Sequence, residues 1–337
     1  MERPDHRMDT LEPFLSRAGW ADARRTALAG DASARRYTRL MREDGARAIL
    51  MVDPGGSVAR FDAVGAALRG MGLSAPEVWA VDTDAGLMLL EDLGDAVFAP
   101  LAEADPALEV TLYETAADVL STLHRHGPLP ELEQATPERL ADMTDLAFDW
   151  YLVRAGAAPD PAAKASARAV FATVLAAHAP ETGVTILRDY HAENLIWLPD
   201  REGAARAGLL DFQDAMAGHP AYDLVSLLQD ARRDVGAAAA DAAMDRFLDG
   251  SDHDPDRFAA AYAALGAQRN LRILGVFARL AATRAKPHYI DLIPRVWAHL
   301  QTNLAHPACA PLRAPLAVLP DPTTALLSRL KAPCLTQ

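Results

Sequence analysis

The amino-acid sequence predicts an α+β protein of two lobes, a small antiparallel β-sheet lobe followed by a larger, mainly helical lobe. Short segments that alternate between apolar and polar residues, separated by turns, fill residues 1–93. Beyond residue 94 the apolar residues recur at helical spacing instead. The chain has 337 residues, which is more than one hydrophobic core usually serves. We therefore expect a division into residues 1–93 and 94–337.

The first lobe contains the pattern of a β-sheet with two helices. Four segments have the alternation of strands: 35–41, 47–52, 78–82 and 87–90. The turn at Asp44-Gly45 separates the first two, and Asp-Gly between alternating segments is a strong hairpin signal. Helical spacing occurs at residues 8–20 and 57–70, where Ser57 is a suitable N-cap for the second helix.

The second lobe is predicted to be mostly helical around one polar loop. Helical spacing covers these segments: 107–126, a helix that begins at Pro137, 161–179 and 255–282. Two strand-like segments, 184–187 and 195–198, enclose the polar loop. Residues 307–337 contain six prolines, and they predict a wrapping or partly loose tail.

Composition excludes several classes of function. The net charge is −13 with a pI near 5.2, which opposes nonspecific binding to nucleic acids and to anionic membranes. Cys309 and Cys334 lack the spacing of a metal site, and two cysteines in a long chain favour a reducing compartment. No apolar signal core or stretch of ~20 apolar residues is present. We expect a cytoplasmic protein that binds a small molecule, with no protein partner predicted.

One polar segment has the residues that phosphoryl transfer to a hydroxyl requires. That reaction needs a carboxylate to orient the hydroxyl and accept its proton, and it needs oxygen ligands for Mg²⁺ on the triphosphate. Asp189, followed after four residues by Asn194, supplies the carboxylate and one amide oxygen. The Asp-x-x-x-x-Asn spacing alone also fits an ordinary polar surface turn.

A second acidic position strengthens this interpretation. Asp211 follows Asp189 by 22 residues, at the end of the apolar segment Gly208-Leu209-Leu210 and before Phe212. A carboxylate in that place can bind Mg²⁺ that bridges the phosphates. A strand-ending Asp is common by itself, but the two motifs in this order, after a small β lobe, favour phosphoryl transfer.

These motifs, together with the segment Gly218–Leu224, resemble the aminoglycoside phosphotransferase/choline kinase branch of the protein-kinase-like fold. The resemblance implies that Asp189 is the catalytic base, that Asn194 and Asp211 are the metal ligands, and that ATP and Mg²⁺ are the cofactors. It also implies that Asp223 braces the catalytic loop, although an acid in the first turn of a helix has the dipole as an equal explanation.

Four further segments narrow the resemblance to the cell-wall sugar kinases of this branch: 30–37, 49–51, 89–94 and 268–275. Those kinases phosphorylate the anomeric hydroxyl of N-acetylmuramate and N-acetylglucosamine during peptidoglycan recycling. The resemblance therefore implies an amino-sugar substrate. The alternatives that remain are an aminoglycoside or other small-molecule phosphotransferase of the same fold, and a non-catalytic pseudokinase.

The first lobe departs from the pattern of this fold because it contains no lysine. The chain has three lysines, the first of them Lys164, and Met51 stands at or near the strand position where a lysine usually holds the phosphates. The following helix has Asp62 as its single acid. Three arginines in or just after the phosphate-covering loop could replace the lysine: Arg35, Arg36 and Arg39.

The remaining predicted site residues fall into two groups. The resemblance implies that the nucleotide is bound by the following residues: Gly30, Ser33, Arg35, Arg36, Glu91 and Leu93. For the acceptor sugar, the helical lobe offers these candidates: Asp149, Trp150, Arg154, Arg188 and Arg272. Trp150 can stack on a sugar ring but is also a typical core residue, and Arg188 can brace the loop instead of binding a carboxylate.

Overall fold

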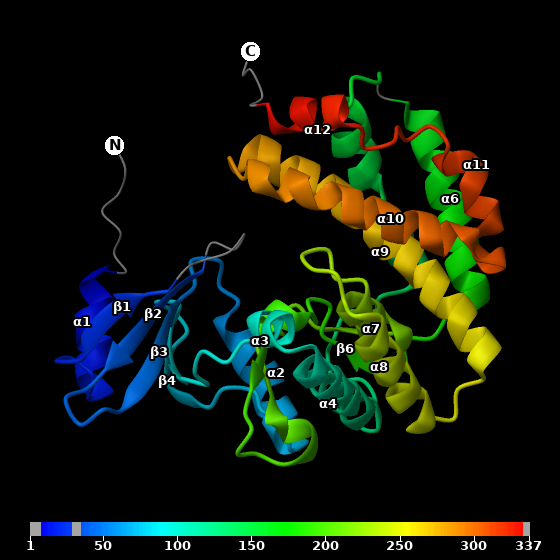
Figure 1. Cartoon of the computed structure of the whole chain (residues 1–337). Helices are drawn as coiled ribbons and strands as arrows, with labels where there is room; N and C mark the ends of the chain where they lie inside the picture. The colour runs from blue at the N-terminus through cyan, green and yellow to red at the C-terminus, as the bar shows by residue number, and fades with distance from the viewer. Residues whose placement is uncertain (1–7, 29–34, 159, 333–337) are drawn as a thin grey trace. The chain divides into compact units, whose positions relative to one another are not determined.

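The computed structural model describes residues 8–28, 35–158 and 160–332 (Figure 1). The chain divides into two compact units, residues 1–101 with 193–214, and residues 102–192 with 215–337. The predicted lobe boundary at residues 93 and 94 stays a prediction; the packing adds that residues 193–214 belong to the first unit. In the described residues no helix is both long enough and apolar enough to cross a membrane.

A five-stranded antiparallel sheet in the order β1-β2-β3-β5-β4 forms the first unit (Figure 1). Its strands are β1 (Arg24–Ala27), β2 (Arg36–Met41), β3 (Arg47–Val52), β4 (Val78–Asp82) and β5 (Leu87–Glu91). The four strands predicted from alternation are confirmed within one residue at each end. The sequence analysis did not predict β1, because all four of its residues are exposed and it has no apolar alternation.

Helix α1 (Met8–Arg17) covers one face of this sheet with Phe14 and Leu15, which pack against Leu40, Leu50 and Leu89. Strand alternation gives each strand one row of residues for this core and leaves the other row for the opposite face. The sheet therefore has one face fixed by the core and a second face whose side chains are available for a site.

Helix α2 (Val58–Gly70) has the predicted residue, Ser57, at its N-cap position. Ser57 precedes the helix, but its side chain makes no capping bond. Its hydroxyl instead donates to Asp53 at 2.5 Å, and Asp53 also accepts the backbone N–H groups of Gly55 and Ser57. The predicted cap position is therefore confirmed, but the Ser57 hydroxyl is bound to the Asp53 carboxylate, a charge-assisted acceptor, instead of capping the helix.

The segment 193–214 returns to the first unit as a hairpin. Its strands β7 (Leu195–Trp197) and β8 (Ala207–Leu209) pair with each other, with the short helix η3 (Gly203–Arg206) between them. Backbone bridges join Gly208 to Ser74 and Ile196 to Val97. The two strand-like segments that enclose the polar loop are confirmed, but they do not pair with each other: β6 (Val184–Ile186) pairs with β9 (Met216–Gly218) in the second unit.

The second unit is mainly helical, which confirms the predicted fold class (Figure 1). Its longer helices are α4 (Pro106–His124), α6 (Pro161–His178), α8 (Ala237–Asp249), α9 (Pro255–Thr283) and α10 (Ile293–Ala305). Its shorter ones are α5 (Pro137–Asp142), η1 (Ala147–Leu152), η2 (Ala192–Asn194, which runs into the first unit), α7 (Ala221–Leu228), η4 (Pro287–Leu292), η5 (Pro307–Leu312), α11 (Arg313–Leu316) and α12 (Thr324–Lys331). Helix α3 (Phe98–Ala104) spans residues of both units. The predicted tail is therefore helical over much of its described length, because Thr323 caps α12.

Helix α9 packs against α6, α7, α10 and α12 and against η1, η4 and η5, and α10 lies along it (Figure 1). Gly275 on α9 permits this packing, since a Cβ built there would lie 2.2–2.5 Å from backbone atoms of Leu146 and Ala147. Backbone atoms at that distance cannot move aside without displacing the π-helix η1. The close approach explains in physical terms why a glycine ends the 268–275 segment.

Replacing Gly275 by Ala is expected to lower the free energy of unfolding by about 3 kcal/mol, the upper range for overpacked cores. Chemical denaturation followed by circular dichroism measures the change. Gly183→Ala is the matched control, because a Cβ at Gly183 meets no atom within 4 Å, and its effect should stay within about 0.5 kcal/mol. A loss of less than about 1 kcal/mol for Gly275→Ala would show that η1 can shift at little cost.

His124 at the end of α4 makes unfolding of the second unit sensitive to acid. Its ring lies 5.7 Å from that of Phe247 on α8, and neither ring nitrogen makes a hydrogen bond among the described residues. Burial, together with the charges of the neighbouring His253 and His219, lowers the pKa of His124 to about 3. Because this pKa lies below that of an unfolded histidine, the stability that neutral His124 contributes is complete above pH 6.5 and is lost as the pH falls.

The expected loss from His124 alone is about 2 kcal/mol between pH 8 and pH 5. His124→Phe keeps an aromatic ring beside Phe247 and removes the titration. As the pH falls from 8 to 5, the unfolding free energy of wild type should therefore decrease by about 2 kcal/mol relative to that of His124→Phe. A difference that does not change with pH would mean that His124 is protonated in the folded protein.

Candidate active site

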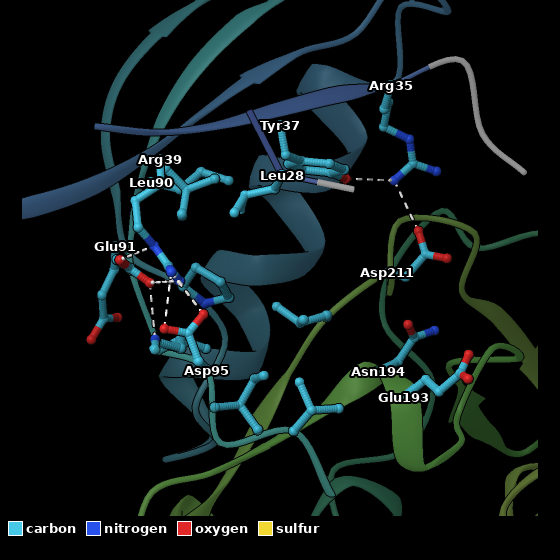
Figure 2. Close-up of a pocket in the computed structure, with 18 of the residues that line it drawn as sticks. Leu28, Arg35, Tyr37, Arg39, Leu90, Glu91, Asp95, Glu193, Asn194 and Asp211 are labelled. Atoms are coloured by element: carbon cyan, nitrogen blue, oxygen red, sulfur yellow. Dashed lines mark hydrogen bonds and ion pairs between the residues drawn. The ribbon is translucent and has the colours of Figure 1, made fainter. Parts of the chain in front are cut away.

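A cavity of about 420 Å³ lies within the first unit, on the sheet face opposite α1 (Figure 2). Apolar side chains line its middle: Ile49, Phe61, Leu90, Leu93, Ile196 and Leu210. Polar groups gather at two ends, one with Arg39, Glu91 and Asp95 and the other with Arg35, Asn194 and Asp211, as Figure 2 shows. An apolar middle with a cation and potential metal ligands at one of its ends suits a ligand that has an apolar ring and an anionic part.

Asp211 is held at the edge of this cavity by strained backbone and by its neighbours. Its φ is 58°, in the left-handed region that costs a non-glycine residue about 1–3 kcal/mol. Its Oδ1 accepts hydrogen bonds from Arg35 Nη1 at 2.9 Å and from Gln213 Nε2 at 3.0 Å. The next residue, Phe212, packs on Phe61 of α2 with ring centroids 4.6 Å apart. This aromatic contact fixes the backbone that presents the carboxylate.

Asn194 lies beside Asp211 because the β7–β8 hairpin brings them together. The Leu210 N–H, one residue before Asp211, donates to the Asn194 carbonyl at 3.0 Å. Figure 2 shows both side chains at the same end of the cavity. A carboxylate and an amide oxygen are ligands that Mg²⁺ accepts, and Mg²⁺ commonly takes one or two protein ligands with the rest from phosphates and water. In the described residues no cluster of three or more acidic, His or Cys side chains could hold a metal alone. The pair therefore fits a metal that takes its other ligands from water or from phosphates.

The connector after β5 forms the other end of the cavity. Asp92 is almost fully buried, pairs with Arg39 at 2.7 Å and accepts the Gly94 N–H at 3.0 Å. Glu91 pairs with Arg201 at 2.7 Å. Within the described part of the chain, the Leu93 backbone N–H at the cavity wall donates no hydrogen bond. An available donor beside apolar side chains fits the edge of an adenine ring.

The loop that carries Asp189 is in the second unit, and Asp223 of α7 braces it. The Asp223 carboxylate is fully buried and accepts the backbone N–H groups of Leu187 at 2.5 Å and Arg188 at 2.8 Å. Burial raises the pKa of Asp223 to about 7, although these two hydrogen bonds and the charge of Arg269 favour the ionised form. Arg188 has a φ of 72°, so the loop turns sharply immediately before Asp189.

Helix α9 supplies a second brace that the sequence analysis did not identify. Arg269 is buried and donates from Nη2 to Ser226 Oγ at 2.6 Å, and Ser226 Oγ donates to the Arg188 carbonyl at 3.1 Å. Burial lowers the pKa of His191 well below its ordinary value, and Arg232 and Arg269 lower it further. His191 is therefore neutral near pH 7. The resemblance in segment 268–275 pointed to this part of the chain, but which of its residues braces the loop depends on how α9 packs.

The other predicted residues lie in different places. Asp149 and Trp150 are in η1, where Asp149 pairs with Lys164 at 2.7 Å. Arg154 donates to the Leu330 and Ala332 carbonyls at 2.9 and 2.5 Å, so it holds the end of α12. Arg272 is half-buried on α9, and Arg36 is exposed on β2. The acceptor roles of these residues and of Arg188 stay predictions. Gly30 and Ser33 lie outside the described residues.

Comparison with known proteins gives a match to the phosphotransferase enzyme family over residues 24–261. The chain belongs to this family. It is 41% identical to an N-acetylmuramate/N-acetylglucosamine kinase of Caulobacter vibrioides over 340 aligned residues, which cover 89% of this chain and 93% of the relative. It is 30% identical to a Pseudomonas aeruginosa protein of the same name, over 93% of this chain and 95% of that one.

Solved structures place this phosphotransferase in the same fold. A choline/ethanolamine kinase family protein of Mesorhizobium loti matches with a TM-score of 0.62, at 18% identity, over 96% of this chain and 99% of that one. The choline kinase LicA of Streptococcus pneumoniae matches with a TM-score of 0.61, at 14% identity, over 88% of this chain and 99% of that one. The predicted resemblance to the aminoglycoside phosphotransferase/choline kinase branch is thereby confirmed.

Proposed function

We propose that this phosphotransferase is an ATP- and Mg²⁺-dependent kinase that transfers the γ-phosphate to the anomeric hydroxyl of N-acetylmuramate, N-acetylglucosamine or both. The observation that carries the proposal is the 41% identity to a kinase of that name over 89% of this chain. The cavity of the first unit supports it, because its apolar middle suits adenine and its Arg35, Asn194 and Asp211 end suits a metal-bound triphosphate. We place the reaction in cell-wall recycling in the cytoplasm.

Each residue has a role that follows from its chemistry. Asp189 orients the anomeric hydroxyl and accepts its proton as the new O–P bond forms and ADP leaves with the electrons of the broken bond. Asn194 and Asp211 would hold Mg²⁺, which supplies charge stabilisation to the transferring phosphoryl group when bound. An anomeric hydroxyl is more acidic than an ordinary alcohol, so a modest base suffices.

The braced loop serves this chemistry by fixing where the base stands. Asp223 accepts the two backbone N–H groups that precede Asp189, and Ser226 donates to the Arg188 carbonyl, which follows them along the chain. Positioning of this kind matters because an error of about 1 Å in a reacting group can cost ~100-fold in rate. The lowered pKa of His191 makes its ring a weak proton acceptor, so it does not compete with Asp189 for the proton.

Mg²⁺-dependent release of ADP, measured in parallel with four acceptors, tests the proposal. We expect turnover with N-acetylmuramate or N-acetylglucosamine and the product to be the sugar 1-phosphate. Turnover with kanamycin or choline alone would instead assign the chain to another acceptor class of the family. No turnover with any of the four, despite nucleotide binding, would favour the pseudokinase alternative.

A further inference from the structure

The strand position that usually carries the phosphate-holding lysine is fully apolar in this chain. Met51 on β3 is completely buried, and its partner in the β2–β3 register is Tyr37. Cross-strand partners share a face of the sheet, and residues two apart along a chain share it as well. Arg35, two residues before Tyr37, therefore projects from the same face of the sheet as Met51 and lies next to the position of Met51. The cavity confirms this geometry, since Arg35, Tyr37 and Ile49 all line it.

The surroundings of the three candidate arginines distinguish them. Arg39 lies at the connector end of the cavity, where it pairs with Asp92 and Asp95 at 2.7 Å each. Arg36 points to the other face of β2 and is exposed. The Arg35 side chain has 11% of its surface exposed and reaches the end of the cavity that holds Asn194 and Asp211 (Figure 2). Of the three, Arg35 alone stands where phosphates would lie beside the metal ligands.

Arg35 is also bonded to one of those proposed ligands. Its Nη1 lies 2.9 Å from Asp211 Oδ1 and 3.4 Å from the Tyr37 hydroxyl oxygen. A largely buried guanidinium without an anion would be costly, whereas the Asp211 carboxylate, 39% exposed, also has access to solvent. The ion pair satisfies the guanidinium, but it occupies Oδ1, one of the two carboxylate oxygens that could bind a metal.

We propose that Arg35 replaces the missing lysine and serves two anions in turn, the Asp211 carboxylate in the free protein and the nucleotide phosphates in the complex. This inference rests on the proposed function. When a nucleoside diphosphate binds, the Arg35 guanidinium moves to the phosphate oxygens, and the Asp211 carboxylate becomes available to a metal. Because one charge-assisted pair is exchanged for another, neither group is left buried and unpaired. The planar fork of arginine can grip phosphate oxygens with two N–H groups, which a lysine cannot do.

Calorimetric titrations with ADP and with adenosine test the phosphate role. Arg35→Met is expected to weaken ADP binding at least ~10-fold, the range for one lost charge-assisted hydrogen bond, and to change adenosine binding less than about twofold. Arg35→Lys should fall between Arg35→Met and wild type, because it keeps the charge without the fork. Arg24→Met, an exposed arginine of the same sheet, is the control and should bind both ligands as wild type does.

Binding of Mn²⁺ without nucleotide, measured by electron paramagnetic resonance, tests the exchange. Removing Arg35 frees Asp211, so Arg35→Met should bind Mn²⁺ roughly two- to fivefold more tightly than wild type, the range for loss of one partly exposed ion pair. In Arg35→Met the affinity for Mn²⁺ should therefore rise while the affinity for ADP falls. A purely structural role of Arg35 would weaken both.

Each of the other outcomes would contradict the inference about Arg35, the exchange between its two anions, or the proposed function. Equal ADP affinity in Arg35→Met and wild type removes the inference and leaves the proposed function intact. Equal losses for ADP and adenosine, or a larger ADP loss in Arg36→Met than in Arg35→Met, also remove it. Unchanged or weaker Mn²⁺ binding in Arg35→Met removes the exchange. Failure of wild type to bind ADP more tightly than adenosine removes the proposed function itself.

Discussion

Replacing Asp189 by Asn is expected to lower kcat by a factor of about 10²–10⁴, the range for loss of a positioned general base. Asparagine has nearly the shape of aspartate but cannot accept the hydroxyl proton at neutral pH. The bonds by which Asp223 and Ser226 brace the loop end on backbone groups that the substitution leaves in place, so the loop should keep its conformation. Steady-state ADP release with N-acetylmuramate measures the effect.

Nucleotide binding separates this result from misfolding. All residues that line the cavity belong to the first unit, whereas Asp189 belongs to the second. The affinity of Asp189→Asn for ADP should therefore stay within about twofold of wild type. Asp241→Asn, an exposed residue of α8, is the matched control and should keep full turnover. Near-normal turnover in Asp189→Asn would remove Asp189 from the role of base.

Replacing Asp211 by Asn is expected to lower kcat by roughly 10²–10³, the loss typical for one preorganised electrostatic group at the transition state. The variant removes a negative charge from the proposed metal site, so half-maximal activity should require a higher Mg²⁺ concentration. It also releases Arg35 from its ion pair. Metal-free ADP should consequently bind the variant at least as tightly as it binds wild type.

Activity as a function of Mg²⁺ concentration, with calorimetry of ADP in the presence of a chelator, measures both effects. Asp200→Asn is the matched control, because Asp200 is an exposed acid in the same returning segment. An unchanged Mg²⁺ dependence in Asp211→Asn would show that the metal does not bind this carboxylate. Weaker metal-free binding of ADP would count against the exchange that we infer for Arg35.

Local patterns predicted much of the secondary structure. Strands β2 to β5 were readable because each alternates along a sheet with one buried face, and α9 because its apolar residues recur at helical spacing. The exposed β1 and the proline-rich end of the chain give no such signal. The partners of β6 and β7 were also not predictable, because pairing depends on residues 10 or more positions away that no local pattern specifies.

The sequence by itself determined the class of reaction, because Asp189, Asn194 and Asp211 are the residue types that phosphoryl transfer requires and their spacing can be read along the chain. Tertiary structure decided which cation lies beside Asn194 and Asp211. Arg35, Arg36 and Arg39 have the same chemistry and nearly the same position in the sequence, and they differ in what the fold places opposite each one. Asp211 lies 176 residues from Arg35, and the packing of Phe212 on Phe61 fixes the backbone that presents its carboxylate to Arg35. Such contacts are set by the packing of distant segments, which local sequence does not encode.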